Sequence, residues 1–263
     1  MTVIVVSNQK GGVGKTTTAI SLGAAFAERG QRVLIVDLDP QANATSGLGI
    51  SKDPPNPIYG VLLKEQPLTD SITATAVDRL DLVASGPDMA GAEVELVPLM
   101  AREFRLRQAL RDASGYDTVI VDCPPSLGLL TINALAAGDA VLIPVQCEYY
   151  ALEGLAQLLK TIDAVRDRLN GRLEVAGIVL TMEDRRNRLS LQVIDEVRRH
   201  FPSLVTSARI PRTVRLAEAP SHGVPISVYD RHSPAAQAYD DLAGELALRL
   251  QGRQTLALRG AIA

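Results

Sequence analysis

A glycine-rich loop near the N-terminus limits the fold of this chain more than any other feature. An apolar run at residues 3–6 precedes Lys10-Gly11-Gly12-Val13-Gly14-Lys15-Thr16-Thr17, and a helical pattern covers residues 15–29. Glycines let backbone N–H groups turn toward phosphate oxygens, and the N-terminus of the following helix adds the positive end of its dipole. A strand, such a loop and a helix in this order predict an α/β protein that binds a nucleoside triphosphate.

An additional lysine distinguishes this loop from the common phosphate loop. The pattern GxxxxGK[ST] requires glycine at position 9, where this chain has Gln9, and Lys10 opens the loop instead. In such loops the second lysine, here Lys15, reaches the β- and γ-phosphates, and the hydroxyl of Thr16 binds Mg²⁺. A glycine-rich turn that binds nothing is the alternative, and the strand–loop–helix context disfavours it.

Short runs of Val, Ile and Leu alternate with longer helical patterns along the whole chain. The runs are continuous rather than alternating, which is typical of parallel strands covered on both faces. They lie at residues 3–6, 33–36, 80–84, 118–121, 140–145 and 175–180. Helical patterns occupy residues 15–29, 94–112, 127–137, 152–169, 189–201 and 234–250. This order predicts an α/β fold with a doubly wound, mostly parallel sheet and helices on both faces.

The size and composition of the chain suit one domain. Of its 263 residues 46% are hydrophobic, so we expect a large core in residues 1–250 and a tail at 251–263 that frays or lacks order. A membrane anchor is the alternative for the tail, but its apolar residues are small or scattered and none is aromatic. No stretch approaches the ~20 apolar residues of a membrane span, and the two cysteines lack CxxC spacing. These features favour a soluble cytoplasmic protein without a membrane partner.

Two acidic positions follow predicted strands, where an open α/β sheet places its ligand. Asp39 stands in the sequence DLDPQ, and Asp122 begins the sequence DCPP. Asp122 fits the carboxylate that holds Mg²⁺ through water in P-loop NTPases, and Asp39 fits a residue that orients the attacking water. A helix cap or an exposed strand-end carboxylate is the alternative for each, and the phosphate loop favours the functional interpretation.

Five motifs together resemble the ParA/MinD group of deviant Walker-A ATPases. They are KGGVGKTT, VDLDPQANATSGLG, VDCPPS, PVQCEYYALEG and IPRTVRLAEAPSHG, and the resemblance extends from residue 3 to about residue 250. The greatest likeness is to the short chromosomal ParA proteins, often called Soj, which partition DNA. The resemblance implies ATP and Mg²⁺ as cofactors, hydrolysis of ATP to ADP and phosphate, and a homodimer in the ATP state.

The resemblance also implies roles for individual residues. Lys10 would reach across the ATP-bound dimer and stabilise charge on the partner's transferring phosphoryl group. Asp39 would activate water, and Asp122 would be the Walker-B carboxylate. The catalytic residues would then be Lys10, Lys15 and Asp39. The nucleotide would be bound by Lys10, Gly11, Gly12, Val13, Gly14, Lys15, Thr16, Thr17, Pro211 and Arg212, of which the last two usually border the adenine.

One position departs from the pattern of the family. Ala42 stands where we expect the glycine of the motif DPQGN. Alanine adopts a positive φ less readily than glycine, so the loop after Asp39 should be stiffer or differently shaped. The change adds one methyl group and removes no catalytic group, and we expect hydrolysis to persist.

Charge is distributed unevenly along the chain, whose formal net charge is −3. Residues 160–215 contain 12 Lys and Arg against 7 Asp and Glu, and the remainder contains 15 against 23. A globally basic nucleic-acid binder is therefore excluded, but a local basic face is compatible with these numbers. A solvated helix face with ordinary ion pairs is the alternative for this segment.

The family resemblance implies that this basic segment binds double-stranded DNA. Arg186 and Arg215 are the closest matches to DNA-binding arginines of the family, and Arg185 and Arg188 lie beside the first of them. We expect contacts to phosphates rather than to bases, with an affinity that falls steeply as salt rises.

These observations predict an ATPase that partitions chromosomes or plasmids at the nucleoid. Its ATP-bound homodimer would bind DNA non-specifically, and a ParB-type centromere-binding partner would release it by stimulating slow hydrolysis. A MinD-like membrane-cycling ATPase is the first alternative and requires an amphipathic anchor, which the tail does not convincingly supply. A nitrogenase-iron-protein-like reductase or an amide-forming synthetase is the second, and suitably placed cluster cysteines are lacking for the reductase.

Overall fold

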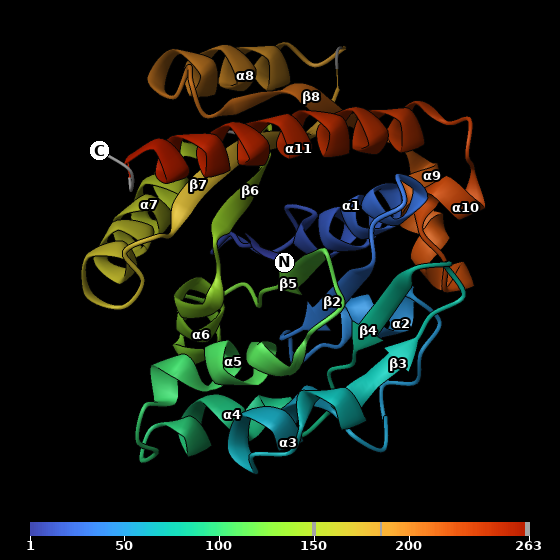
Figure 1. Ribbon diagram of the computed structural model, residues 1–263. Helices are drawn as coiled ribbons and strands as arrows, with labels where there is room; N and C mark the ends of the chain where they lie inside the picture. Colours follow the sequence, from blue (N-terminus) through green and yellow to red (C-terminus); the bar gives the residue numbers. More distant parts are fainter. Residues whose placement is uncertain (149–150, 185, 261–263) are drawn as a thin grey trace.

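One twisted sheet runs through the computed structural model, which describes residues 1–148, 151–184 and 186–260 (Figure 1). Its eight strands lie in the order β3-β4-β2-β5-β1-β6-β7-β8. They are β1 (Thr2–Val6), β2 (Val33–Asp37), β3 (Ile72–Ala74), β4 (Leu80–Val83), β5 (Thr118–Asp122), β6 (Ala140–Gln146), β7 (Glu174–Glu183) and β8 (Val205–Pro211). Neighbouring strands are parallel except β3 and β4, which are antiparallel. The doubly wound, mostly parallel fold predicted from the sequence is confirmed.

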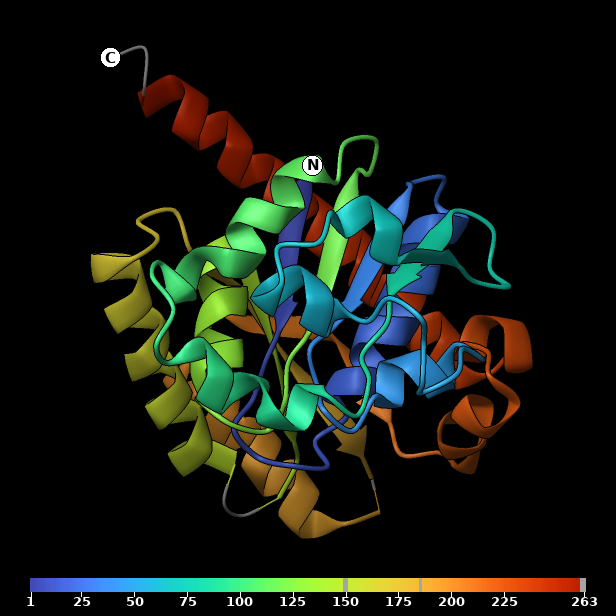
Figure 2. The ribbon, with the colours of Figure 1, turned by 90° about the horizontal axis from the view of Figure 1, so that it is seen from below.

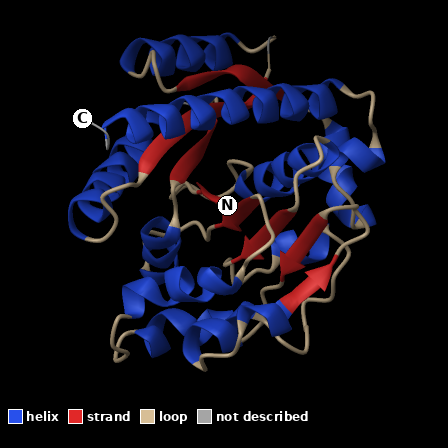
Figure 3. Cartoon of the chain, in the orientation of Figure 1, coloured by secondary structure: helices blue, strands red, loops and turns tan. Residues whose placement is uncertain are grey.

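Helices cover both faces of this sheet (Figure 3). They are α1 (Lys15–Glu28), α2 (Asn43–Gly47), α3 (Ile58–Leu63), α4 (Met89–Leu96), α5 (Arg105–Ala109), α6 (Leu129–Ala137), α7 (Ala151–Arg168), α8 (Arg188–His200), α9 (Val214–Glu218), α10 (Ile226–Tyr229) and α11 (Pro234–Gly260). The 3-10 turns are η1 (Leu68–Ser71), η2 (Arg102–Phe104), η3 (Leu110–Asp112) and η4 (Ala219–His222).

Alternate residues of the central strands point into two separate apolar cores. Ile4 and Val6 of β1 pack with residues of α1 and α11, whereas Val3 and Val5 belong to the core beneath helices α3 to α8. All four side chains are buried. Burial on both faces explains why the strand sequences are continuously apolar rather than alternating.

The prediction of a single helix over residues 94–112 is wrong. The chain forms α4, then η2, α5 and η3 in succession. Pro98 interrupts the pattern, because proline has no backbone N–H to donate to the preceding turn, although Val97 before it keeps helical dihedral angles. Ala101 then adopts a left-handed conformation with φ of 52°, which turns the chain into η2.

The C-terminal helix α11 is longer than the helical pattern of the sequence indicates. It continues past residue 250 to Gly260, and Figure 2 shows its last turns extending beyond the body of the sheet. Residues 261–263 of the predicted tail lie outside the described part of the chain. Within the described ranges, no helix combines the length and the apolar character that crossing a bilayer requires.

The carboxyl ends of three central strands meet at one edge of the sheet. Val6 of β1 pairs with Asp122 of β5, and Asp37 of β2 pairs with the same residue from the other side. The phosphate loop follows β1, Asp39 lies two residues after the end of β2, and Asp122 is the last residue of β5. Sheet order therefore gathers the three predicted elements of the nucleotide site, which lie far apart in sequence.

Candidate active site

The phosphate loop connects β1 to α1 with an unusual backbone. Gly12 and Gly14 have φ of 74° and 86°, a left-handed conformation that favours glycine. Gly14 is the N-cap of α1 and offers no side-chain hydrogen bond, and the first turn of the helix contains no acidic residue. The first N–H groups of a long helix are therefore uncapped and face the loop, which is the arrangement that binds a phosphate.

Lys15 lies inside this loop. Its Nζ donates a hydrogen bond to the carbonyl oxygen of Lys10 at 3.1 Å, and only 6% of the residue is exposed. Burial lowers the pKa of Lys15, while the nearby carboxylates of Asp122 and Asp39 oppose this shift. Among the described residues this ammonium has one hydrogen-bond partner, a carbonyl oxygen, so it keeps N–H groups free to bind an anion such as phosphate.

Lys10 points out of its own loop. Its Nζ lies 2.9 Å from Oε2 of Glu148, and the other oxygen of Glu148 accepts a hydrogen bond from Nε2 of Gln146 at 2.6 Å. About a third of the Lys10 side chain and half of the Glu148 side chain are exposed. An exposed ion pair of this kind is weak, so Lys10 can exchange Glu148 for another partner at low cost.

Asp37 holds the loop after β2 and is a residue whose role the sequence analysis missed. Its carboxylate accepts hydrogen bonds from the backbone N–H of Asp39 at 3.1 Å and of Thr45 at 2.9 Å, and from the Thr45 hydroxyl at 2.8 Å. Burial raises the pKa of Asp37 to about 6, and these hydrogen bonds oppose the rise. The sequence signal was present, because Asp37 is the first residue of DLDPQ, the motif that contains Asp39.

Asp39 is buried and its polar groups anchor the same loop. One carboxylate oxygen accepts a hydrogen bond from the backbone N–H of Gln41 at 2.9 Å, and its carbonyl oxygen accepts one from the Ser85 hydroxyl at 2.8 Å. The loop is thereby fixed beside the phosphate loop, because β2 and β1 both flank β5. Orientation of the attacking water by Asp39 stays a prediction.

The carboxylate of Asp122 is fully buried, and within the described residues neither of its oxygens has a well-formed hydrogen bond, although the Thr16 side chain is near enough to interact with it. Burial raises the pKa of Asp122 well above its ordinary value, Asp37 raises it further, and Thr16 and Lys15 oppose the rise. An unpartnered buried carboxylate is costly unless a ligand compensates it. Hard cations prefer such oxygen ligands, so the residues present fit Mg²⁺ held by Thr16 and, through water, by Asp122.

Replacing Asp122 by asparagine should stabilise the protein when nucleotide and metal are absent. The raised pKa means that the folded state binds more protons than the unfolded state above the ordinary pKa of 3.8, so the free energy of unfolding falls as pH rises. Asp122→Asn removes this penalty and should gain about 1–3 kcal/mol near pH 7, with less gain toward pH 4. Urea unfolding in EDTA across this pH range measures the effect, and a variant less stable than wild type near pH 7 would contradict it. The variant should also lose the additional stabilisation that magnesium gives to the ATP-bound protein.

Ala42 adopts the left-handed conformation for which the family motif supplies glycine. Its φ and ψ are 51° and 43°, it is the N-cap of α2, and it is buried. The conformation of the loop is thus retained, and the methyl group imposes a backbone cost of about 1 kcal/mol.

Ala42→Gly is therefore expected to raise the free energy of unfolding by about 1 kcal/mol, because it relieves the cost of positive φ. A matched control is Ala44→Gly two positions later inside α2, which should lower stability, because glycine is a poorer helix former than alanine. Urea denaturation midpoints of the two variants should move in opposite directions. A shift in the same direction for both would show that loop strain is absent.

A cavity of about 280 Å³ is lined by Gly14 and Thr17, at the end of the phosphate loop and the start of α1. Its walls include the predicted residues Pro211 and Arg212. The other lining residues are Thr181, Met182, Ile210, Thr213, Leu216, Ala217 and Tyr239. Their mostly apolar character suits the flat face of a nucleobase. Sequence analysis missed them, since β7 and α11 reach the phosphate loop only through the fold.

Two hydrogen bonds attach this cavity to the phosphate loop. The Thr181 hydroxyl donates to the carbonyl oxygen of Val13 at 2.8 Å, and the hydroxyls of Thr18 and Tyr239 lie 3.2 Å apart. This cavity, called the base cavity below, therefore adjoins the phosphate loop, as the predicted nucleotide site requires.

The predicted DNA-binding arginines emerge at the edge where β7 and β8 end. Glu183 of β7 pairs with Pro211 of β8, and the backbone N–H of Arg212 donates to the carbonyl oxygen of Glu183 at 3.1 Å. The segment that carries Arg186 and, at the start of α8, Arg188 therefore leaves the sheet beside the segment that carries Arg215. Arg185 lies outside the described residues.

Arg215 is partly neutralised in this arrangement. Its guanidinium lies 3.4 Å from the Glu218 carboxylate and 3.6 Å from that of Asp230, and its central carbon lies 5.9 Å from the centre of the Tyr229 ring. Arg186 and Arg188 are exposed, and neither side chain forms an ion pair that the described residues show. Arg186 and Arg188 are thus more readily available to a phosphate than Arg215 is.

The sequence of this chain is similar to those of Soj and ParA proteins. A family model described as an AAA domain matches residues 1–175. The sporulation initiation inhibitor protein Soj of Bacillus subtilis is 56% identical over 247 residues, which cover 93% of this chain and 98% of Soj. The chromosome partitioning protein ParA of Myxococcus xanthus is 54% identical over 249 residues, which cover 94% of this chain and 88% of ParA.

Two solved structures with similar folds carry different names. The cobyrinic acid a,c-diamide synthase of Mycobacterium smegmatis, with bound ADP and magnesium, has a TM-score of 0.84 and 39% identity, and the alignment covers 95% of this chain and 96% of that one. The cell division ATPase MinD of Pyrococcus furiosus has a TM-score of 0.78 and 26% identity, with coverage of 94% and 98%. The similarity therefore extends over nearly the whole length of both chains.

Proposed function

Because this chain belongs to the ParA/MinD family of P-loop ATPases, we propose that it partitions DNA by cycling between separate subunits and an ATP-bound homodimer. The protein is an ATPase with ATP and Mg²⁺ as cofactors. Its dimer binds double-stranded DNA non-specifically at the nucleoid, and a ParB-type partner releases it by stimulating slow hydrolysis. The names of two relatives, both chromosome partitioning proteins, favour a chromosome over a plasmid as the cargo.

One observation supports the coupling of ATP to DNA more than any other. Leu216 and Ala217 line the base cavity, and Arg215 precedes them in the same short helix, α9. A base that packs against this helix can shift the guanidinium that faces solvent from it. The nucleotide state and the DNA-binding surface are thus connected through one turn of helix.

The residues of the site divide the work of hydrolysis between two chains. Lys15 and the uncapped first turn of α1 hold the phosphates. Thr16 and, through water, Asp122 would hold Mg²⁺, which would neutralise phosphate charge. Asp39 orients the attacking water. Lys10 leaves Glu148 and stabilises the charge that develops on the partner's γ-phosphate, as an arginine finger does.

Binding of random-sequence duplex DNA in four nucleotide states tests this proposal. We expect tight, salt-sensitive binding with a non-hydrolysable ATP analogue, transient binding with ATP, and weak binding with ADP or without nucleotide. Size-exclusion chromatography of the same samples should show a dimer only in the first two states. Equal DNA affinity in all four states would contradict a nucleotide-controlled partitioning cycle.

Two other functions have specific support and make different predictions. The Pyrococcus MinD neighbour favours a membrane-cycling ATPase, which would sediment with anionic lipid vesicles in ATP and leave DNA unbound. The Mycobacterium neighbour favours a synthetase, whose ATP turnover would depend on cobyrinic acid and a nitrogen donor. The sequence identity to the partitioning proteins exceeds both, at 56% against 26% and 39%.

A further inference from the structure

Four buried residues form a closed ring of hydrogen bonds around the backbone of Asp39. The Thr45 hydroxyl donates to Oδ2 of Asp37 at 2.8 Å and accepts from the backbone N–H of Ser85 at 2.9 Å. The Ser85 hydroxyl donates to the carbonyl oxygen of Asp39 at 2.8 Å, and the N–H of Asp39 donates to Oδ1 of Asp37 at 3.1 Å. The ring therefore joins three separate segments, which are the end of β2 with the loop after it, α2, and the residues after β4.

Thr45 connects the two halves of the ring. A hydroxyl is both a donor and an acceptor, and the Thr45 hydroxyl uses both capacities. The backbone N–H of Thr45 also donates to Asp37, at 2.9 Å. This N–H lies in the first turn of α2, where the N-cap Ala42 offers no side-chain acceptor, so Asp37 caps the helix instead. Asp37, Thr45 and Ser85 are each fully buried, so a bond that is lost here leaves a polar group without water as a substitute.

The ring fixes the backbone of Asp39 on both sides of its side chain. The N–H and the carbonyl oxygen of Asp39 each take part in a hydrogen bond of the ring. Of its carboxylate, Oδ1 accepts from the N–H of Gln41 at 2.9 Å. Within residues 1–148, 151–184 and 186–260, no hydrogen bond involves Oδ2 of Asp39, so this oxygen is available to a water molecule. The direction in which Oδ2 points depends on the backbone that the ring holds.

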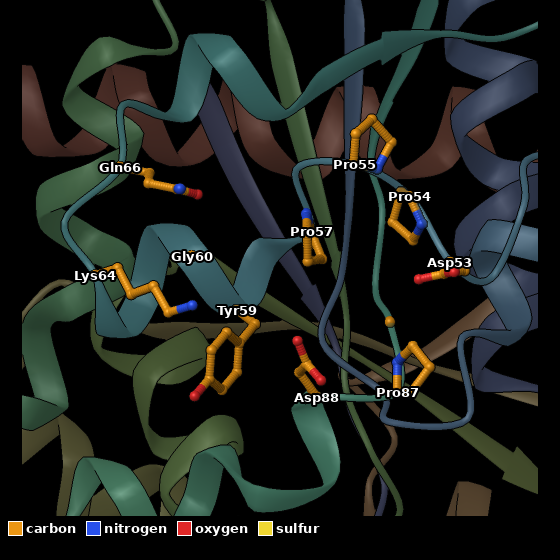
Figure 4. Close-up of a pocket in the computed structure, with 11 residues that line it drawn as sticks. Asp53, Pro54, Pro55, Pro57, Tyr59, Gly60, Lys64, Gln66, Pro87 and Asp88 are labelled. Atoms are coloured by element: carbon orange, nitrogen blue, oxygen red, sulfur yellow. The ribbon is translucent and has the colours of Figure 1, made fainter.

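Rigid neighbours hold Ser85 in place. Gly86, which follows it, lies so close to the proline-rich loop of residues 53–57 that a Cβ at this position would be 3.4 Å from Cβ of Pro57. Figure 4 shows Pro57 and Pro87 at the cavity of about 670 Å³ that this loop and the segment after Ser85 line. Proline fixes φ, so these walls change shape little and Ser85 keeps its position.

We propose that Thr45 and Ser85 are positioning residues for hydrolysis, which direct Oδ2 of Asp39 toward the attacking water. The inference rests on the proposed function, in which Asp39 orients that water. Both hydroxyls act only through Asp39, so they set the rate of the chemical step and leave the affinity for ATP unchanged. A displacement of about 1 Å in such a group can cost roughly a hundredfold in rate, so a small movement of the Asp39 backbone is sufficient.

Steady-state ATP hydrolysis by the full-length variants Thr45→Val, Thr45→Ser and Ser85→Ala tests the assignment. Valine has nearly the shape of threonine but neither donates nor accepts a hydrogen bond, whereas serine keeps the hydroxyl. Thr206→Val and Ser71→Ala are the controls. Thr206 is buried, its hydroxyl donates to main-chain carbonyl oxygens, and it lies on β8 at the opposite end of the sheet from β4. Ser71 is buried, and among the described residues its hydroxyl has no hydrogen-bond partner.

We expect Thr45→Val and Ser85→Ala to lower kcat about ten- to hundredfold, while the Kd for a non-hydrolysable ATP analogue stays within about twofold of wild type. Thr45→Ser should recover most of the wild-type kcat, and both controls should hydrolyse ATP like wild type. Wild-type kcat in Thr45→Val and Ser85→Ala, or an equal loss of kcat in the controls, would overturn the assignment. A loss of affinity for the analogue as large as the loss of kcat would also overturn it, because the two residues would then maintain the whole nucleotide site.

Asp39→Ala, measured beside these variants, separates the inference from the proposed function. An Asp39→Ala protein that hydrolyses ATP at the wild-type rate would contradict the water-orienting role of Asp39, on which the inference rests. A nearly inactive Asp39→Ala protein beside fully active Thr45→Val and Ser85→Ala proteins would overturn the positioning residues alone. In single-turnover experiments Thr45→Val/Asp39→Ala should react no more slowly than Asp39→Ala, because the hydroxyl acts only through Asp39. A further loss of rate in the double variant would show an action of Thr45 that is independent of Asp39 and would overturn the proposed route.

Discussion

Equal mixing of Lys10→Ala and Asp39→Ala subunits should restore ATP hydrolysis that neither variant shows by itself. Each active site is expected to combine Asp39 and Lys15 of one chain with Lys10 of the other. Lys10→Ala alone should bind ATP but hydrolyse it about a thousandfold more slowly, which is the range of a missing arginine finger. In the mixed dimer one of the two sites contains every group, so the mixture should recover about a quarter of the wild-type rate per chain.

A double variant supplies the matched control for this experiment. Asp39→Ala mixed with Lys10→Ala/Asp39→Ala forms the same dimers, but neither site contains Asp39, so no activity should return. Rates are measured as phosphate release at subunit concentrations where chromatography shows dimers. Mixed dimers without recovered activity would show that Lys10 acts within its own chain, and a fully active Lys10→Ala protein would remove Lys10 from the reaction.

The ion pair of Lys10 with Glu148 gives this prediction its structural basis. The ammonium that should act on a second chain is held outside its own loop, 2.9 Å from an exposed carboxylate. Lys15, by contrast, is buried inside the loop and bonded to the carbonyl oxygen of Lys10. Two lysines five positions apart therefore have different environments, and only Lys10 can reach a neighbouring subunit without leaving a buried position.

Local sequence predicts the parts of this molecule that depend on near neighbours in the chain. The phosphate loop, the apolar strands and the positions of Asp39 and Asp122 follow from residue types within a few positions of one another. Each of these features is encoded within a single strand–loop–helix unit.

Contacts between distant segments account for what the sequence did not predict. Ser85 reaches Asp39 only because β4 lies beside β2, an order that periodicity does not reveal. Tyr239 reaches Thr18 across 221 positions, which makes α11 part of the base cavity. The broken helix over residues 94–112 has a local cause in Pro98, but the left-handed Ala101 that completes the break carries no signal in its residue type.

Substitution of the predicted DNA-binding residues Arg186 and Arg215 has the second large expected effect. Arg186→Glu/Arg215→Glu should lower the affinity of the ATP-bound protein for random duplex DNA by at least about a hundredfold at moderate salt. A dimer loses four phosphate contacts, so the slope of log affinity against log salt should become shallower by about 3 to 4. Fluorescence anisotropy at several salt concentrations, with a non-hydrolysable ATP analogue, measures both quantities.

Arg107→Glu/Arg111→Glu is the matched control, because it makes the same charge change on α5 and η3, away from the edge where β7 and β8 end. Its salt slope should equal that of wild type. The single variants add a further distinction: Arg186 is exposed, whereas Arg215 must first leave Glu218 and Asp230. Arg186→Glu should therefore weaken binding more than Arg215→Glu. A double variant with unchanged affinity and slope would place the DNA on another surface. Identical losses of affinity in the control would show that the effect comes from net charge alone.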